Sequence, residues 1–410
     1  MANPLPGLGD IDNLARIQPT RRRNQRHLRP PAEAITTRKI GSEEQTILAV
    51  NNLKVTFHTY AGDVKALDGV ELFVKKGEVL GLVGESGCGK SVTALAIVGL
   101  LPPNAEIVSG EAVLDGTDLL GMGKDELRLT RLRDVAIVFQ DPMTYLNPVL
   151  TVGLQITEII ASQPDLFIPE LIKNRLNEIS TIEKSNGELT RKLQIEREKL
   201  QVKSQTNRLG NDELSRLARL YAISILKSVR LPEPEKVFKM YPFELSGGMR
   251  QRAMIAMALI RRPKILLADE ITTALDVTVQ AQALQLLQQL KEVIDTSVLL
   301  ITHDLAVVAE VCDRVAVMYA GNVVEVADVT ELFKNPMHPY TQGLLASVPR
   351  VDVVAEQKSI QGSVPDLMFP PSGCRFHPRC PRVFDKCSAA KPPLIEVSPG
   401  HLVSCFLYGG

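Results

Sequence analysis

The sequence predicts an α/β fold built around a phosphate-binding loop. Short β-branched runs alternate with helix-favouring stretches, and the glycine-rich segment Gly84 to Ser91 follows one such run, Val79 to Val83. Continuous apolar runs of this kind are typical of strands buried on both faces. With 410 residues, of which 45% are apolar and 23% charged, the chain can bury a large core and carry additions.

Composition and charge narrow the class of protein. Lys+Arg and Asp+Glu both number 47, so the chain has no net field to attract nucleic acid, and we expect no nucleic-acid partner. The apolar runs fall far short of the roughly 20 residues that a membrane-spanning helix needs. The first residues lack an apolar signal core, so we expect a reducing cytosol, where cysteines remain thiols or bind metal.

Residues 1–45 are predicted to form a flexible basic tail. Pro and Arg are frequent there, and the stretch from Arg21 to Lys39 contains seven basic residues and a single acidic one, Glu33. Such a segment is either a solvated leader or weakly attracted to anionic lipid head groups.

The core domain is expected to span residues 46–330. Its strands are predicted at Val55 to Phe57, Val79 to Val83, Val135 to Phe139, Ile265 to Ala268 and Val298 to Ile301. A helical subdomain is predicted at about 141–260, because charged, helix-favouring sequence follows Pro164.

An insertion of about 165–215 within this subdomain is predicted to form a helical hairpin. Ser185 to Gly187 interrupt it as a turn does, and a further helix is expected from about Asp212 to Val229. The hairpin is either a solvated ornament or a surface for a partner. Residues 331–410 are proline-rich and are expected to form an irregular extension.

The loop fits the eight-position phosphate-binding pattern in full, with a helix predicted from Val92 to Leu101. Backbone N–H groups of such a loop surround phosphate oxygens, and the following helix adds its partial positive charge. Lys90 is expected to reach the β and γ phosphates and Ser91 to ligate Mg²⁺. The predicted nucleotide-binding residues of the loop are Gly84, Glu85, Ser86, Gly87, Cys88, Gly89, Lys90, Ser91 and Val92. Cys88 occupies a variable position, where it is either a passenger or a source of thiol-sensitive ATP binding.

Two later segments complete the predicted site. Asp269 and Glu270 end an apolar strand, where Asp269 is placed to hold Mg²⁺ and Glu270 to act as general base towards water. Ser246, Gly247 and Gly248 precede a helical run from Ala253 to Ile260 and offer another anion-binding helix N-terminus.

Taken in order with Gln140, Ala274 to Asp276 and His303, these segments resemble an ABC ATPase nucleotide-binding domain over roughly residues 47–330. The resemblance implies that two such domains face head to tail, each ATP lying between one phosphate loop and the opposite Ser246 to Gly248. It also implies a nucleotide contact at Asp276.

Further roles carry over from the resemblance, residue by residue. Tyr60 is expected to stack on adenine, and Gln140 to contact Mg²⁺ and the attacking water while linking to the transmembrane partner. His303 is expected to contact the γ phosphate as a catalytic residue. Ile271 departs from the family's usual proline, which removes a restraint on φ beside Glu270 and is expected to alter loop stiffness.

Two segments resemble the ATP-binding subunits of dipeptide and oligopeptide importers, a group that includes nickel-uptake relatives. They are Phe139 to Pro148 and His338 to Thr341, the latter followed by Leu344, Leu345 and Pro349. The resemblance implies a peripheral ATPase at the cytoplasmic face of the cell membrane. Its partners would be a second, different ATPase subunit, two transmembrane permeases and, indirectly, an extracytoplasmic peptide-binding protein. Alternatives are another cargo such as nickel or glycans, a soluble ABC ATPase acting on DNA or ribosomes, and an iron–sulfur redox protein.

Four cysteines stand in the extension with 5, 6 and 17 residues between them, namely Cys374, Cys380, Cys387 and Cys405. In a reducing compartment, clustered thiols favour metal over disulfides. The spacing resembles the iron–sulfur segment of the peptide-importer ATPases and predicts a [4Fe-4S] cluster, with Zn²⁺ or free thiols as alternatives.

Overall fold

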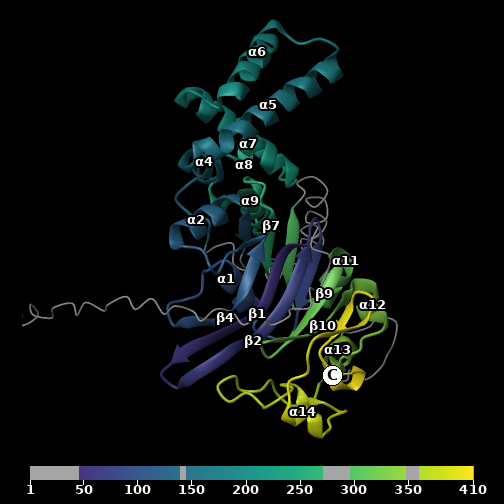
Figure 1. The fold of residues 1–410 in the computed structure, drawn as a ribbon. Helices are drawn as coiled ribbons and strands as arrows, with labels where there is room; N and C mark the ends of the chain where they lie inside the picture. Colours follow the sequence, from purple (N-terminus) through teal and green to yellow (C-terminus); the bar gives the residue numbers. More distant parts are fainter. Residues whose placement is uncertain (1–45, 139–144, 271–295, 348–359, 410) are drawn as a thin grey trace, which may run out of the picture. The chain divides into compact units, whose positions relative to one another are not determined.

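The computed structural model describes residues 46–138, 145–270, 296–347 and 360–409 (Figure 1). All of them belong to one compact unit of the chain, residues 43–410. The predictions for the basic tail, Gln140, Ile271 and Asp276 lie outside the described residues.

A small antiparallel sheet is formed first along the chain, and its described strands have the order β2-β1-β4-β5. Their bounds are Thr46–Thr59 for β1, Gly62–Lys75 for β2, Ala105–Leu114 for β4 and Thr117–Asp118 for β5. The predicted strand from Val55 to Phe57 lies near the C-terminal end of β1, but it is not buried on both faces. Burial alternates along it, so that Leu53 and Val55 are buried while Lys54 and Thr56 are partly exposed. The prediction was wrong in this respect, because three residues are too few to reveal an alternating pattern.

The main sheet has the strand order β11-β12-β10-β9-β3-β8-β7-β6 within the described residues. Its five strands from β9 to β6 run parallel, and they are β3 (Val79–Val83), β6 (Val135–Val138), β7 (Ile265–Asp269), β8 (Ser297–Ile301) and β9 (Arg314–Tyr319). Every residue of β3, β7 and β8 is buried, as their continuous apolar runs predicted. Because these strands are parallel, the loops that follow them meet at one edge of the sheet.

The helices beside this sheet are short. They are α1 (Lys90–Ile97), α2 (Lys124–Arg133), α11 (Leu305–Val311) and α12 (Val329–Lys334). The expected helix up to Leu101 ends earlier, because Gly99 adopts a φ of 63° that breaks the helical path. The apolar face of α1, with Ala94 and Ile97 buried, packs against the sheets.

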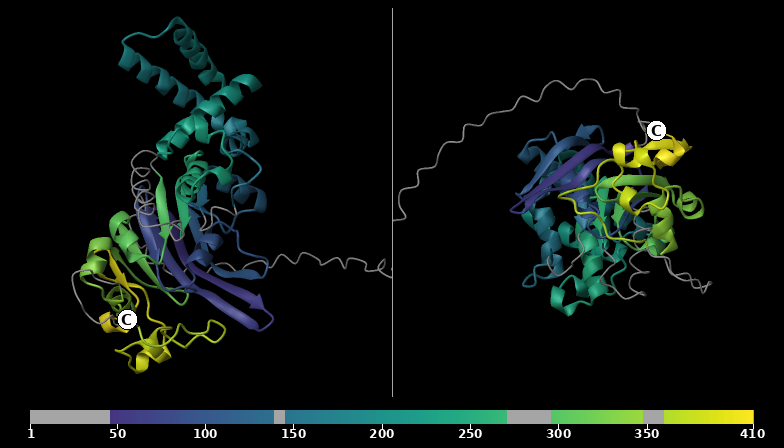
Figure 2. Two further views of the ribbon diagram at one scale, coloured as in Figure 1. Left: turned by 180° about the vertical axis from the view of Figure 1, so that it is seen from behind. Right: turned by 90° about the horizontal axis from the view of Figure 1, so that it is seen from below.

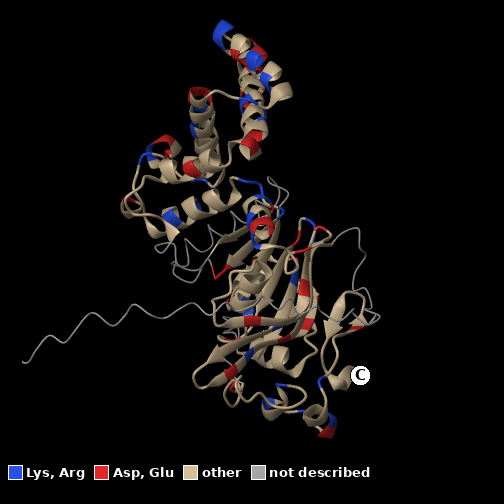
Figure 3. Cartoon of the chain, turned by 60° about the vertical axis from the view of Figure 1, so that its left-hand side comes forward, with Lys and Arg blue, Asp and Glu red and all other residues tan. Residues whose placement is uncertain are grey.

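The helical part comprises α4 to α9 (Figure 1). Its helices are α4 (Val152–Ser162), α5 (Pro164–Asn186), α6 (Arg191–Thr206), α7 (Asn211–Ser228), α8 (Pro234–Val237) and α9 (Gly247–Leu259), with a 3-10 turn at Pro242–Glu244. The segment in which the hairpin was predicted contains the two consecutive helices α5 and α6, and α5 ends where Gly187 adopts a φ of 74°. Basic and acidic residues are interspersed along it (Figure 3), and Arg175 forms ion pairs with Glu178 and Glu196.

The C-terminal part is less irregular than predicted. It contains α13 (Pro339–Ala346), 3-10 turns at His377–Arg379 and Phe406–Tyr408, α14 (Asp385–Ala389), β11 (Ile395–Ser398) and β12 (His401–Val403). Strand β12 pairs antiparallel with β10 (Asn322–Asp328), so this segment extends the main sheet (Figure 2). The short length of β11 and β12 explains why no periodic pattern revealed them. The division at residues 330 and 331 stays a prediction.

No helix among the described residues is both long and apolar enough to cross a membrane. The longest, α5, carries charged side chains throughout its length.

Candidate functional site

The phosphate loop leaves β3 at Val83 and enters α1 at Lys90. Gly84 has a φ of 156°, and a Cβ there would lie 2.1 Å from the carbonyl oxygen of Met318 on β9. Gly89 has a φ of 107° and would place a Cβ 2.7 Å from Leu67. Both positions therefore require glycine, because the loop folds tightly against the sheet.

The side chain of Lys90 is buried and lies within its own loop. Its Nζ donates to the carbonyl oxygens of Gly84 at 2.8 Å and Glu85 at 3.1 Å. An ammonium group held by carbonyl dipoles can exchange them for phosphate oxygens. The arrangement therefore suits an incoming polyphosphate.

Ser91 and Asp269 come together although 178 residues separate them. The Ser91 hydroxyl donates to Asp269 Oδ1 at 3.0 Å. Burial at the end of β7 raises the pKa of the Asp269 carboxyl, and the hydrogen bond from Ser91 opposes this effect. A hydroxyl next to a desolvated carboxylate is an oxygen donor pair of the kind that Mg²⁺ prefers.

Glu270 and His303 form a second pair at the same edge. His303 Nδ1 lies 3.3 Å from Glu270 Oε1, and His303 follows β8, which is the parallel neighbour of β7. Glu270 has a φ of 48°, which is uncommon for a non-glycine residue, and its backbone N–H donates to Ile301 at 2.8 Å. The strand pairing thus places Glu270 and His303 next to each other.

Ser246 begins α9 as its N-cap. Its hydroxyl accepts from the Met249 backbone N–H at 3.3 Å, and both Ser246 and Gly247 are exposed. The N-terminal turn of this 13-residue helix is therefore accessible.

Two other predicted residues differ sharply in exposure. Tyr60 stands fully exposed in the turn between β1 and β2. Cys88 is buried, and burial raises the pKa of its thiol although Lys90 Nζ lies 3.8 Å from the sulfur. A raised thiol pKa disfavours the reactive thiolate.

The four late cysteines all border one small pocket, which His338 and His377 also line. Burial raises the pKa of Cys374 to about 11. Within the described residues, however, no group of three or more His, Cys, Asp or Glu side chains is placed to hold a metal ion.

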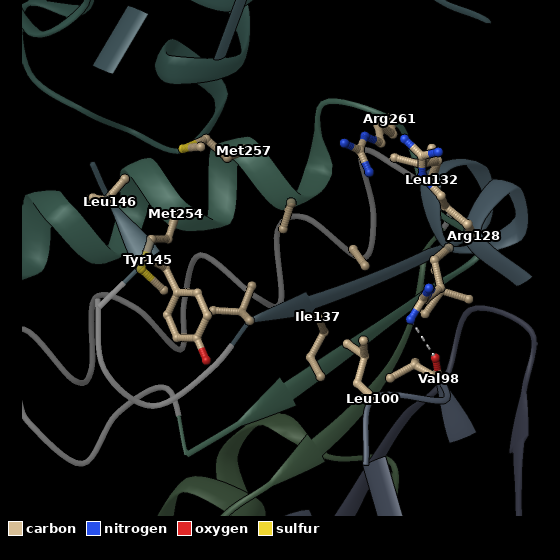
Figure 4. Close-up of a pocket in the computed structure, with 15 residues that line it drawn as sticks. Val98, Leu100, Arg128, Leu132, Ile137, Tyr145, Leu146, Met254, Met257 and Arg261 are labelled. Carbon is tan, nitrogen blue, oxygen red and sulfur yellow. Dashed lines mark hydrogen bonds between the residues drawn. The ribbon is translucent and has the colours of Figure 1, made fainter. Parts of the chain in front are cut away.

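Two sets of residues were missed by the sequence reasoning. Tyr340 and Arg379 contact Glu85 of the phosphate loop. Of the two, only Tyr340 lies in a segment that the sequence singles out, His338 to Thr341. A surface groove also lies between α2, β6 and α9, where apolar side chains meet three arginines (Figure 4). No local sequence pattern predicts either set, because each set brings together residues from distant segments of the chain.

Comparisons with known proteins identify the family to which the chain belongs. Residues 67–273 match the family model for the ABC transporter, and residues 324–387 match that for the oligopeptide/dipeptide transporter C-terminal region. The oligopeptide transport ATP-binding protein OppD of Escherichia coli is 41% identical over 91% of this chain and 97% of its own length. The dipeptide transport ATP-binding protein DppD of Bacillus subtilis is 43% identical over 88% of this chain and 95% of its own.

Solved structures agree with this result. An ATP-binding cassette described as a dimer in a post-hydrolysis state with ADP and Pi matches with a TM-score of 0.51 and 26% identity, over 69% of this chain and 98% of its own. The fold, the phosphate loop and the long matches to transport ATP-binding proteins lead to one conclusion. The chain belongs to the ABC transporter family as an ATP-binding subunit of the oligopeptide/dipeptide importer type.

Proposed function

We propose that this chain binds MgATP and hydrolyses it, as one half of an ATPase pair, to drive peptide import through permease subunits. One observation carries the catalytic part of the proposal. Lys90, the Ser91 and Asp269 pair, and the Glu270 and His303 pair follow β3, β7 and β8 at one edge of the sheet. The relatives named for oligopeptide and dipeptide transport support peptides as the cargo.

Each of these residues has a distinct part in hydrolysis. Lys90 leaves its carbonyl partners to neutralise the β and γ phosphates. Glu270 accepts a proton from the attacking water, and His303 orients the carboxylate while contacting the γ phosphate. The fixed backbone of Glu270 keeps its carboxylate aligned and so limits the reorganisation that the reaction requires.

Ser91 and Asp269 would hold Mg²⁺, with Gln140 as a further ligand. When bound, the metal would neutralise negative charge on the phosphate groups of ATP. The two described residues fit this role because their oxygens already lie in contact.

The second half of the nucleotide site would come from a partner ATPase. The exposed N-terminus of α9, with Ser246 to Gly248, is available to bind the phosphates held by the facing subunit. Tyr60 would stack on adenine from its exposed turn, and Asp276 would contact the nucleotide. We expect the partner to be a different homologue.

Replacing Glu270 by glutamine tests the catalytic part. Phosphate release from ATP should fall at least about a hundredfold, because a general base contributes roughly 10² to 10⁴ in rate. ATP should remain bound and trap a dimer with the partner ATPase that size-exclusion chromatography detects. Glu235→Gln, on the exposed side of α8, is the matched control and should hydrolyse ATP normally. Normal hydrolysis by Glu270→Gln would overturn the assignment.

The groove in Figure 4 is the proposed contact for a permease. Tyr145 and Leu100 are exposed there, and Met254 and Met257 of α9 lie along one wall. An amphipathic helix from a permease loop, apolar on one side and acidic on the other, would match these side chains and the arginines beside them, Arg128, Arg131 and Arg261. Docking there would place the chain peripherally at the cytoplasmic face of the membrane.

A pair of substitutions tests this contact. Met257→Glu should prevent co-purification with the two permeases, because it puts a carboxylate into an apolar contact. Leu154→Glu, in an exposed position of α4 on a different groove, should leave assembly intact. Equal assembly of both variants would exclude this groove.

The cysteine pocket is proposed to bind a [4Fe-4S] cluster. The donor chemistry supports this, since four thiols border one pocket and the Cys374 N–H donates to the Cys387 carbonyl at 2.8 Å. The side chains would have to move closer to ligate iron, since no metal-holding group is formed in the described part of the chain. Protein purified without oxygen should contain iron and absorb visible light, and Cys374→Ser should lose both. Bound zinc or metal-free protein would refute the cluster.

A further inference from the structure

Glu85, the second residue of the phosphate loop, is held by the C-terminal part of the chain. Its backbone N–H donates to the Tyr340 hydroxyl at 3.0 Å. Its carbonyl oxygen accepts from Lys90 Nζ at 3.1 Å and from the Cys88 N–H at 3.2 Å. Its carboxylate receives the guanidinium of Arg379. Both backbone groups and the side chain of Glu85 are therefore engaged, two of them by residues more than 250 positions away.

The ion pair between Arg379 and Glu85 is bidentate and partly shielded from water. Nη1 lies 2.9 Å from Oε2 and Nη2 lies 3.2 Å from Oε1, with the Arg379 side chain 7% and the Glu85 side chain 26% exposed. Exposed pairs contribute little to stability, but a partly buried pair with two parallel hydrogen bonds fixes both distance and orientation. Arg379 is itself immobilised, because Nε donates to the Gln361 carbonyl at 3.0 Å and Nη1 to the Tyr319 hydroxyl at 3.3 Å.

Tyr340 is equally fixed. It is completely buried, with its ring centroid 4.6 Å from that of Tyr319 and 5.5 Å from that of Phe376. Burial raises the pKa of the Tyr340 phenol, so the hydroxyl stays neutral and can accept from the Glu85 N–H. Because the packed ring holds the Tyr340 hydroxyl in place, the hydrogen bond from the Glu85 N–H restrains the position of the phosphate loop.

We propose that Arg379 and Tyr340 are positioning residues that hold the phosphate loop through Glu85 and thereby raise its affinity for ATP. The inference rests on the proposed ATPase function. Glu85 belongs to the loop whose backbone N–H groups are expected to surround the phosphates, so displacement of Glu85 changes the path of that loop. It also removes one of the two carbonyls that hold Lys90 Nζ in place before ATP binds. The ordering of the loop is then present before ATP arrives, which lowers the entropy cost of binding.

The test is Arg379→Ala, measured by titration calorimetry with MgATP and by steady-state hydrolysis. We expect the Kd and KM for ATP to rise roughly tenfold, equivalent to about 1.4 kcal/mol. The kcat should change less than about twofold, since Arg379 does not touch Glu270 or the attacking water. If wild-type protein binds no ATP, the proposed function fails. If wild type binds and Arg379→Ala binds equally well, only this inference fails.

A matched control separates positioning of the loop from general attachment of the C-terminal part. Lys391 also joins this part to the core, through Asp68 of β2 at 3.6 Å, but it does not contact the phosphate loop. Lys391→Ala should leave the Kd for ATP within about twofold of wild type. An equal loss of affinity in both variants would overturn the proposal.

A double-mutant cycle gives a test that remains valid if one variant folds poorly. In a Glu85→Ala background, Arg379→Ala should have no further effect on the Kd, because the path through Glu85 is already removed. Tyr340→Phe removes only the hydroxyl and should by itself raise the Kd, with the thermal transition preserved by the intact ring. Additive effects of Glu85→Ala and Arg379→Ala, or an unchanged Kd in Tyr340→Phe, would contradict the mechanism.

Discussion

Replacing Glu325 by alanine should strongly destabilise the attachment of the C-terminal part. Glu325 is on β10 and is completely buried. Its carboxylate accepts from the backbone N–H groups of Met337 at 2.7 Å and His338 at 2.9 Å, and from His401 Nε2 on β12 at 2.8 Å. Alanine leaves all three donors without their acceptor, and the donors of His338 and His401 are buried. At about 1 to 3 kcal/mol for each orphaned donor, and with partial relaxation, the free energy of unfolding should fall by roughly 3 to 6 kcal/mol.

Urea unfolding followed by circular dichroism at pH 7.5 measures this loss. Glu331→Ala is the control, because Glu331 lies on neighbouring α12 with its side chain 44% exposed, 3.9 Å from His401 Nδ1. An exposed partner of this kind should change the free energy of unfolding by less than about 1 kcal/mol. If Glu325→Ala unfolds as the control does, the buried carboxylate does not hold the two strands and the loop together.

Lys90→Ala should abolish measurable ATP binding in calorimetry, because no other described side chain of the loop carries a positive charge. Glu85→Gln should weaken ATP binding in the same assay by less than Glu85→Ala does, since the amide oxygen can still accept one hydrogen bond from Arg379. Burial lowers the pKa of His338 to about 4, although Glu325 opposes this effect, so the folded state favours the neutral imidazole of His338. This contribution to the free energy of unfolding is complete above about pH 6.5. It is lost as the pH falls towards 4, by up to about 3 kcal/mol. Over this range the urea midpoint of the wild type should drop more steeply than that of His338→Asn.

The sequence was sufficient for the parts of the site that depend on local pattern. The runs Ile265 to Ala268 and Val298 to Ile301 agree with β7 and β8 to within one residue, because strands buried on both faces leave an uninterrupted apolar signal. Once these strands are parallel, Glu270 and His303 must come together at one edge, and they lie 3.3 Å apart. The turn after α5 could also be predicted from local sequence, since Gly187 ends this helix.

Contacts between distant segments could not be read in this way. Tyr340 and Arg379 reach Glu85 across 255 and 294 residues, and no periodicity links such positions. The pairing of β12 with β10 rests on two registered residue pairs, which is too short a match to predict. Cysteine spacing likewise predicted a metal site; the four cysteines border one pocket, but the spacing carries no information on the distances between sulfur atoms.

These distant contacts make the geometry of the phosphate loop depend on two independent supports. The sheet fixes Gly84 against Met318 of β9, where even one added carbon would clash. The C-terminal part fixes Glu85 through Arg379, and Arg379 directly precedes Cys380 of the cysteine pocket. A chain that has folded only as far as β9 therefore contains Lys90, Asp269, Glu270 and His303 but lacks the second support. Its loop can take the correct path, yet the ordering of Glu85 must then come from the binding energy of ATP itself, which lowers the affinity. Attachment of the C-terminal part and nucleotide binding should accordingly stabilise one another, because each restricts the same loop.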